Sequence, residues 1–317
     1  MSTFNYKEII QDLINFSPRQ LDGETKTAMY LRTWLERNSI PFLRQIFETE
    51  IPVTQRVQLL ADGLEIPCEN SSFVGGTVNN ADNLISSLIS TQPFIYQENI
   101  NFNPKSTALS LSNFYFAPSV AVAKKDIPVL LAATSVTAES IVVRTPHISE
   151  NILVGNCSNP RNLIVAHYDS IKCGATDNAS GVAVALALIK TVPKTLEDTL
   201  YILSGNEELS YDETIYWGHG FRVFEEEYPQ ILEGAEKIFV VDCVGNGPTT
   251  IEKDERIAKL AFPITRLNEC AEKIYSVSGD IDKLMYVYHS NDDTLDQLRE
   301  LYLEETRSAL AIACLSD

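Results

Sequence analysis

Apolar positions recur at helical spacing near the amino terminus and in short runs later in the chain. Residues 4–38 show the helical period twice, separated by a polar link, which predicts two helices. Residues 40–51 mix apolar and polar positions in partial alternation, which predicts a strand with one covered face. The chain is therefore expected to open with two helices and a strand.

Four apolar runs further along have the length of buried strands. They span residues 163–166, 199–204, 237–241 and 285–288. Helical patterns begin near Ser180 and around Phe221, and another runs from Thr294 to about Ile312. Strands that alternate with helices are typical of α/β folds, so we expect a mostly parallel mixed sheet sandwiched by helices.

The chain changes character between residues 52 and 138. This segment is rich in Ser, Asn, Thr, Val and Leu. Three short pieces of it have a β-like pattern: Val57–Leu60, Thr107–Leu111 and Pro128–Ala132. We therefore expect a small, mainly β domain at 52–138, inserted into a catalytic domain that consists of 1–51 and 139–317.

The net charge narrows the classes of partner. At −18, with a sequence pI near 4.6, the chain would be repelled by nucleic acid and by anionic membranes, so neither is an expected partner. Its apolar runs fall short of the ~18 residues that a membrane span needs. The amino terminus shows no apolar signal-peptide core, which predicts a cytoplasmic protein; a secreted protein whose signal had been removed would look the same.

Residues able to bind a metal ion follow each of the four apolar runs. The junctions carry, in chain order, His167 with Asp169 and Asp177, then Glu207 and Glu208, then Asp242, then His289. In open α/β sheets, ligands bind beyond the carboxyl ends of the strands, so these side chains could meet at one edge. Imidazole and carboxylate groups are zinc ligands, and of two adjacent glutamates one can bind metal while the other carries a proton.

Each of these residues also has an ordinary explanation when it is considered alone. Asp177 could cap the helix that starts near Ser180, Asp242 could end a strand without any chemical role, and a pair of glutamates carries little information. The combination is more informative, because two of only four histidines are expected at strand ends with carboxylates at the neighbouring junctions. A metal site is therefore the favoured interpretation.

The order of the motifs resembles the zinc aminopeptidase family, which includes bacterial leucyl aminopeptidases, glutamate carboxypeptidase and glutaminyl cyclase. The motifs are HYDSIKCGATDNASG, a Glu-Glu pair after an apolar strand, VVD and YHSNDDT, all within residues 161–295. The resemblance implies a zinc-exopeptidase fold, a co-catalytic pair of zinc ions, and hydrolysis of amino-terminal residues from peptide substrates.

The resemblance also implies a role for each site residue. His167, Asp177 and Asp242 would hold one zinc ion, and Asp177 would bridge to a second ion that Glu208 and His289 complete. The same ligands accept cobalt or manganese, so either metal could take the place of zinc.

The remaining family roles concern proton transfer and orientation. Glu207 would be the general base that takes a proton from the water bridging the two zinc ions and passes it to the leaving amine. Asp169 would orient His167. Tyr286 or Tyr288 would help to hold the oxyanion, although a buried tyrosine of the core is the simpler explanation for at least one of them.

Two other functions stay open. A glutaminyl-cyclase-like acyltransferase would use the same framework with one zinc ion, and HYDS, GATD and the aromatic loop after Glu208 resemble that branch. A catalytically silent binding relative would be expected to lack ligands or the base. The segment FAPSVAVAKKDIPVLLAA looks like the strand pair of a protease-associated domain, which favours the peptidase. Oligomeric state and side-chain preference are not set by the sequence.

Overall fold

The computed structural model describes residues 4–79, 81–88, 96–212 and 214–316, and these form two compact units. The first, which we call the α/β unit, consists of Met1–Thr49, His147–Ile281 and Asp293–Asp317. The second, which we call the insert unit, consists of Glu50–Pro146 and Asp282–Asp292. No described helix is long and apolar enough to cross a membrane.

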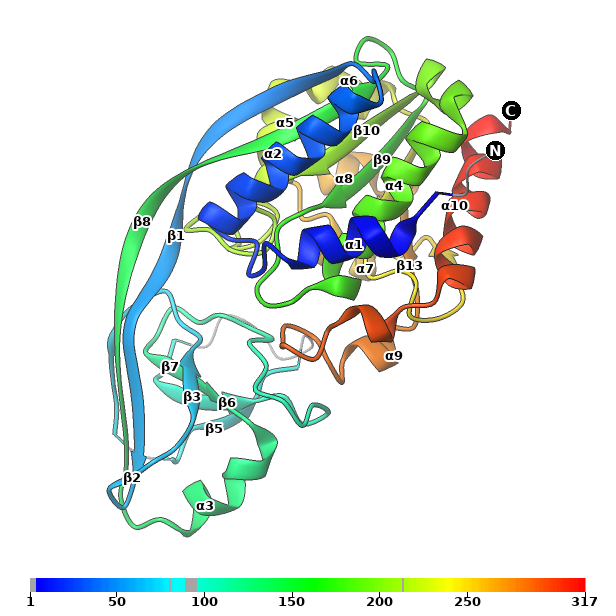
Figure 1. Ribbon diagram of the computed structural model, residues 1–317. Helices are drawn as coiled ribbons and strands as arrows, with labels where there is room; N and C mark the ends of the chain where they lie inside the picture. The colour runs from blue at the N-terminus through cyan, green and yellow to red at the C-terminus, as the bar shows by residue number, and fades with distance from the viewer. Residues whose placement is uncertain (1–3, 80, 89–95, 213, 317) are drawn as a thin grey trace. The chain divides into compact units, whose positions relative to one another are not determined.

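A mixed sheet forms the centre of the α/β unit (Figure 1). Its strands lie in the order β12 (Thr250–Glu252), β13 (Ile274–Ser278), β11 (Lys237–Val241), β9 (Asn162–His167), β10 (Thr199–Ser204), β8 (Val136–Gly155) and β1 (Phe42–Ala61). The inner strands β13, β11, β9 and β10 are parallel, whereas β8 and β12 pair antiparallel with their neighbours. The expectation of a mixed α/β sheet is confirmed.

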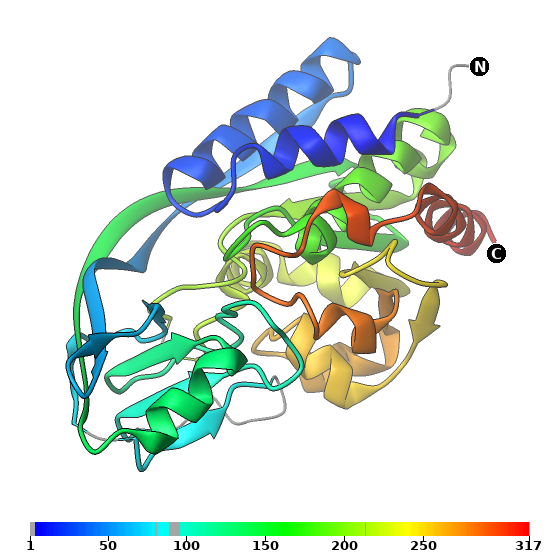
Figure 2. The ribbon, with the colours of Figure 1, turned by 60° about the horizontal axis from the view of Figure 1, so that its bottom comes forward.

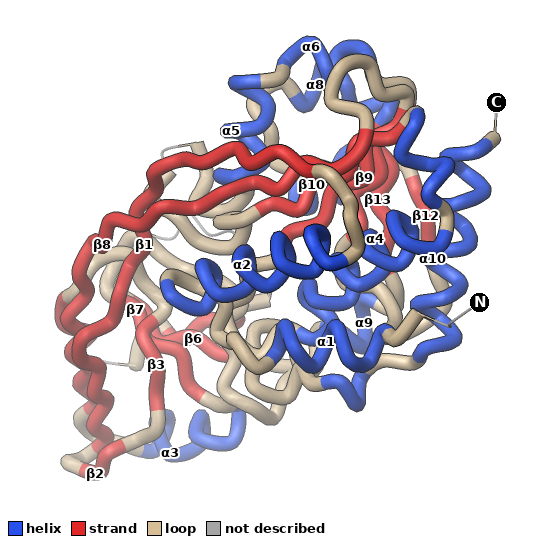
Figure 3. The backbone as a smooth tube through the Cα atoms, turned by 45° about the horizontal axis from the view of Figure 1, so that its top comes forward, coloured by secondary structure: helices blue, strands red, loops and turns tan. Residues whose placement is uncertain are grey.

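Alternate residues of each inner strand enter different apolar layers. In β9, Ile164 and Ala166 pack with one layer of helices, and Leu163 and Val165 pack with the other. The first layer is formed by α1 (Tyr6–Ile14), α2 (Asp22–Arg37), α4 (Ser180–Thr191) and α10 (Glu300–Leu315). The second is formed by α5 (His219–Glu227), α6 (Pro229–Gly234), α7 (Glu255–Ala261) and α8 (Leu267–Cys270). Figure 3 shows the sheet with helices on both faces.

The parallel register brings several loops to one edge of the sheet. Ser204, the last residue of β10, lies opposite His167, the last residue of β9, and β11 runs parallel on the other side of β9. The loops that follow these strands therefore leave the sheet at the same edge. This arrangement collects the candidate ligands that the sequence places after each strand.

The insert unit has its own strands and its own core. Parts of β1 and β8 continue into it, where β2 (Leu64–Glu65) pairs with β1 and β4 (Gly76–Val78) pairs with β8. A second sheet has the order β3 (Cys68–Asn70), β7 (Ser119–Val122), β6 (Asn99–Phe102) and β5 (Leu84–Ser86). Helix α3 (Ile127–Ala132), green in Figure 2, packs against this core through Leu130.

Three strand predictions are wrong. Residues 107–111 form no regular element, Pro128–Ala132 belongs to helix α3, and residues 285–288 form turns after the short helix α9 (Ile281–Leu284). The fourth parallel strand is β13, whose sequence IYSVS contains two serines and gives only a weak apolar signal. Short apolar runs cannot be assigned to helix or strand by periodicity alone.

Two further points concern boundaries. The final helix was expected from Thr294, but a short 3₁₀ turn at Leu295–Gln297 comes first and α10 begins at Glu300. Asp282–Asp292 groups with the insert, whereas the sequence placed it with 139–317. The insertion of a separate domain at 52–138, and its relation to protease-associated domains, stay predictions.

Candidate metal centre

His167 ends strand β9 with its two ring nitrogens facing different carboxylates. Its Nδ1 lies 3.4 Å from Oδ1 of Asp169. Its Nε2 lies 3.2 Å from Oδ1 of Asp177 and 3.4 Å from Oδ1 of Asp242. A histidine that binds a metal through one nitrogen commonly presents the other to an orienting carboxylate. The geometry of His167 matches that pattern, with Asp169 as the orienting group.

Asp169 also connects this junction to the one that follows β10. The residue is fully buried, and its Oδ1 accepts a hydrogen bond from the backbone N–H of Glu207 at 3.0 Å. Its Oδ2 accepts from the backbone N–H of Glu208 at 2.9 Å and from Nε2 of Gln20 at 3.2 Å. One carboxylate therefore fixes the backbone of both glutamates, a role that the sequence did not reveal.

Asp177 lies in an irregular turn, Ala175–Ala179, whose Asp177–Asn178 peptide bond is cis. The carboxylate of Asp293 supports this turn by accepting hydrogen bonds from the backbone N–H of Thr176 at 2.9 and 3.0 Å and of Asp177 at 3.0 Å. Burial raises the pKa of Asp293 to about 6, and the hydrogen bonds oppose that rise. Asp293 thus holds the backbone of a candidate ligand in place.

Two junction turns use a non-glycine residue with left-handed backbone. Asn206, just before Glu207, has φ 50°, and Cys243, just after Asp242, has φ 57°. Such a conformation costs about 1–2 kcal/mol for a residue with a Cβ atom. The Sγ of Cys243 lies 3.1 Å from Oδ1 of Asp242, and with Asp177 these residues form a second group of closely spaced ligand atoms. Cys243 was not among the predicted site residues.

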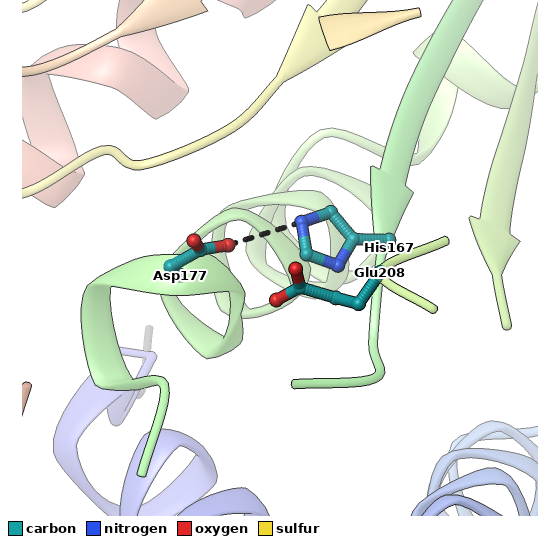
Figure 4. Close-up of side chains that lie close together, drawn as sticks. All are labelled: His167, Asp177 and Glu208. Carbon is teal, nitrogen blue, oxygen red and sulfur yellow. Dashed lines mark ion pairs between the residues drawn. The ribbon is translucent and has the colours of Figure 1, made fainter. Parts of the chain in front are cut away.

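The donor spacing fits a zinc ion. The ligand atoms of His167, Asp177 and Glu208 lie within 4.8 Å of one another, all three residues are buried, and Figure 4 shows their side chains converging. Zinc–nitrogen and zinc–oxygen bonds of about 2.0–2.2 Å place two ligands of a tetrahedron roughly 3.3–3.6 Å apart. The distances from His167 Nε2 to Asp177 and Asp242 are close to that spacing.

The charges of the buried groups also suit a cation. Burial raises the pKa of Glu207 well above its usual range, the charges of Glu208, Asp169 and Asp242 add to the rise, and His167 opposes it. Burial acts to lower the pKa of His167, but the charge of Glu207 and hydrogen bonds to aspartates raise it well above its usual value. A divalent cation would offset this concentration of negative charge.

His289 belongs to the insert unit. It lies in a turn with φ 47° and is buried, and its Nδ1 is 3.0 Å from the carbonyl oxygen of Leu111. A carbonyl can only accept, so Nδ1 carries the proton and Nε2 is the basic nitrogen of this ring. The sequence expected His289 to end a strand, but the residue occupies a turn.

The two candidate tyrosines differ in environment. The ring of Tyr288 stacks on that of His289, with centroids 3.8 Å apart, whereas Tyr286 is 57% exposed. Neither is a buried core tyrosine. Their stacking and exposure distinguish the two residues, and their chemical role stays a prediction.

A comparison with known protein families matches the segment that carries two of the four junctions. Residues 152–240 match the model of peptidase family M28. The M28 match includes the β9 and β10 junctions and ends just before Asp242. No curated protein matches the chain.

Solved structures share the fold over nearly the whole chain. A zinc aminopeptidase from Bacillus subtilis has a TM-score of 0.68 and 16% identity, covering 98% of this chain and 94% of its own. An aminopeptidase from Aneurinibacillus sp. strain AM-1 has a TM-score of 0.60 and 17% identity, with coverage of 97% and 92%. A glutaminyl cyclase from Bacteroides thetaiotaomicron has 0.54 and 13%, with coverage of 100% and 99%. The chain thus has the zinc-exopeptidase fold.

Proposed function

We propose that this protein is an aminopeptidase that removes amino-terminal residues from peptides with the help of two zinc ions. The observation that carries the proposal is the buried convergence of His167, Asp177 and Glu208 in the segment that matches the model of family M28. Glu207, next to Glu208 in the chain, is also buried. Imidazole and carboxylate groups are donor types that hydrolytic zinc sites use.

The ligands divide between two ions in this proposal. His167, Asp177 and Asp242 would hold the first ion, and the distances around His167 Nε2 support this assignment. Asp177 would be shared, and Glu208 and His289 would complete the second. The basic Nε2 of His289 is the nitrogen suited to bind metal, because Nδ1 donates to Leu111.

Glu207 carries the proton in the proposed reaction. Bound zinc would supply a polarised carbonyl and a water of lowered pKa. Glu207 takes a proton from the attacking water and gives it to the leaving amine. Asp169 fixes the backbone of Glu207. Among the groups that raise the pKa of His167, the negative charge of Glu207 has the largest effect, which supports a position of Glu207 near His167. Tyr288, stacked on His289, is our preferred oxyanion donor over Tyr286.

Metal content and hydrolysis measured on the same sample test the proposal. We expect close to two zinc ions per chain and chelator-sensitive release of chromophore from a panel of aminoacyl substrates. A well-folded protein that binds no zinc when purified without chelator would contradict the proposal and would favour a silent binding relative.

The substitution Glu207→Gln tests the assigned base. We expect zinc content to stay unchanged and kcat to fall by about 10²–10⁴-fold, the usual contribution of a general acid–base group. Glu225→Gln is the matched control, because Glu225 is equally buried but accepts from the backbone N–H groups of Thr265 and Arg266 instead. Turnover by the Glu207 variant at the control's rate would sink the assignment.

A glutaminyl-cyclase-like reaction is the second candidate. Two glutaminyl cyclases share the fold with TM-scores of 0.54 and 0.55, and the loop after Glu208 is rich in aromatic residues. About one zinc ion per chain, no aminoacyl hydrolysis, and cyclisation of an amino-terminal glutamine substrate would favour this candidate over the peptidase.

A further inference from the structure

The link between α1 and α2 contacts the loop that carries the candidate ligands. This link, Ser17–Gln20, lies far from that loop in the sequence, yet Arg19 is fully buried beneath it. We call the residues from Tyr168 to Gly174 the ligand loop, because they join Asp169 to the turn that contains Asp177. A buried arginine must satisfy its donors, so the acceptors of Arg19 show what it holds.

The guanidinium of Arg19 reaches both ends of the ligand loop. Its Nε donates to the carbonyl oxygen of Tyr168 at 2.7 Å. Its Nη1 donates to the carbonyl of Cys173 at 3.0 Å, and its Nη2 donates to that of Gly174 at 2.9 Å. One planar group thereby holds one carbonyl at the start of the ligand loop and two at its end.

Neighbouring atoms of the link add to this support. The backbone N–H of Arg19 donates to Oγ of Ser170, and the N–H of Ser170 donates to the carbonyl of Arg19, both at 3.3 Å. Oγ of Ser17 donates to the carbonyl of Cys173 at 2.7 Å, and Gln20 donates to Asp169. The link therefore contacts the ligand loop along its length.

Arg19 also places a positive charge among the buried acids. Burial lowers the pKa of Arg19, and the charges of Asp169, Asp177 and Asp293 act in the opposite direction. These acids are close enough to stabilise the guanidinium. The residue therefore combines a fixed hydrogen-bond geometry with a compensating charge.

We propose that Arg19 is a positioning residue for the metal centre, which sets zinc affinity by fixing the ligand loop between Asp169 and Asp177. The inference rests on the proposed function only in taking zinc as the ligand. Arg19 does not touch the reacting atoms. Its effect passes through the carbonyls of Tyr168, Cys173 and Gly174, whose positions determine where the two aspartates lie.

Arg19→Lys tests this proposal, because lysine keeps the charge but cannot donate to three carbonyls from a planar fork. The probe is Zn²⁺ alone, titrated against a chromogenic chelator. We expect zinc affinity to fall by about 10–100-fold, the range found when residues that support metal ligands are replaced. Ser17→Ala, which removes one hydrogen bond to Cys173, should fold and lower the affinity by a smaller factor.

Arg222→Lys is the matched control. Arg222 is also buried, and it donates to Asp212 and to the carbonyls of Ile215, Trp217 and Pro263. We expect it to lower the unfolding temperature while its zinc affinity stays near that of the wild type.

The outcomes separate this proposal from the proposed function. Wild-type affinity in Arg19→Lys, or an equal loss of affinity in Arg222→Lys at equal stability, would overturn the role of Arg19 and leave the peptidase proposal standing. A wild-type protein that binds no Zn²⁺ would overturn both. Selective loss of affinity in the Arg19 and Ser17 variants supports the positioning role.

Discussion

Asp169 shows how much of the candidate site depends on single side chains. Its two oxygens accept from the backbone of Glu207 and Glu208, and it also faces Nδ1 of His167. His167 at the end of β9 and the two glutamates that follow β10 therefore share one anchor. An amide at this position would keep the size of the side chain but would direct an NH₂ group at a neighbouring N–H donor.

Asp169→Asn should therefore lower zinc affinity by about 10–100-fold, because the amide keeps only one accepting oxygen for the groups that Asp169 orients, His167, Glu207 and Glu208. Competition with a chromogenic chelator measures the change. Asp212→Asn is the matched control, since Asp212 accepts from Arg222 and lies 2.9 Å from Nδ1 of His219. Equal affinities in the two variants would contradict the anchoring role of Asp169.

The sequence was a good guide to residues at strand ends and a poor one elsewhere. His167, Asp177 and Glu208 were predicted from their positions after apolar runs, and the structure brings them together. Arg19 and Asp293 were missed, because a polar link and the second of two adjacent aspartates show no periodicity. The available signal was the motif YHSNDDT, which contains Asp293 but does not show which backbone it contacts.

At the scale of elements, the turn at Gly174 determines the path from the ligand loop into the turn with Asp177. Gly174 has φ +64°, and a Cβ atom there would lie 2.3 Å from the carbonyl oxygen of Asp177 and 2.9 Å from Nη2 of Arg19. Only glycine fits both the backbone conformation and the space.

Gly174→Ala should therefore lower both the unfolding temperature and the zinc content. Gly63→Ala separates the two causes, because Gly63 also has positive φ, +79°, but has nothing within 4 Å of the added atom. Strain alone costs about 1–2 kcal/mol in that control. Thermal unfolding and metal analysis measure both effects, and full zinc content in Gly174→Ala would contradict the crowding argument.

The elements that the sequence predicted best are the long or fully buried ones. Strands β9, β10 and β11 and helices α1, α2 and α4 were all found, because their apolar patterns are strong. Strand β12 was not predicted, because it is only three residues long and all three are exposed. The run at 285–288 looks like a strand, but hydrogen bonds from Asn103 and Ser110 of the same unit hold part of it in turns.

At the scale of the whole molecule, the insert unit is built from two separate parts of the chain, and its residues 50–146 hold the part that bears His289, Asp282–Asp292. Nδ2 of Asn103 donates to the carbonyl of Met285 at 2.9 Å, and Oγ of Ser110 donates to that of Tyr288 at 2.6 Å. The backbone N–H of Leu111 donates to the carbonyl of His289 at 3.0 Å. One proposed ligand therefore depends on residues outside the matched M28 segment.

Asn103→Ala should reduce zinc content from two ions toward one, because the turn before His289 loses a buried hydrogen bond while the His167 group stays intact. Asn99→Ala is the matched control; Asn99 is also fully buried in the insert but bonds to Gln97 and Ser119. Metal analysis of both variants is the measurement. Two ions in the Asn103 variant would show that the hydrogen bond from Asn103 to Met285 is not needed for the second ion.

The hydrogen bonds between residues 282–292 and the rest of the insert unit bear on how such a protein could evolve. The chain enters the insert unit through β1, leaves it through β8, and contributes to it again with Asp282–Asp292. A gene segment encoding only residues 50–146 would lack the third contribution and could not be exchanged between relatives as a self-contained cassette. Gain or loss of the insert would have to be accompanied by changes in the segment around His289, so the two regions are expected to diverge together.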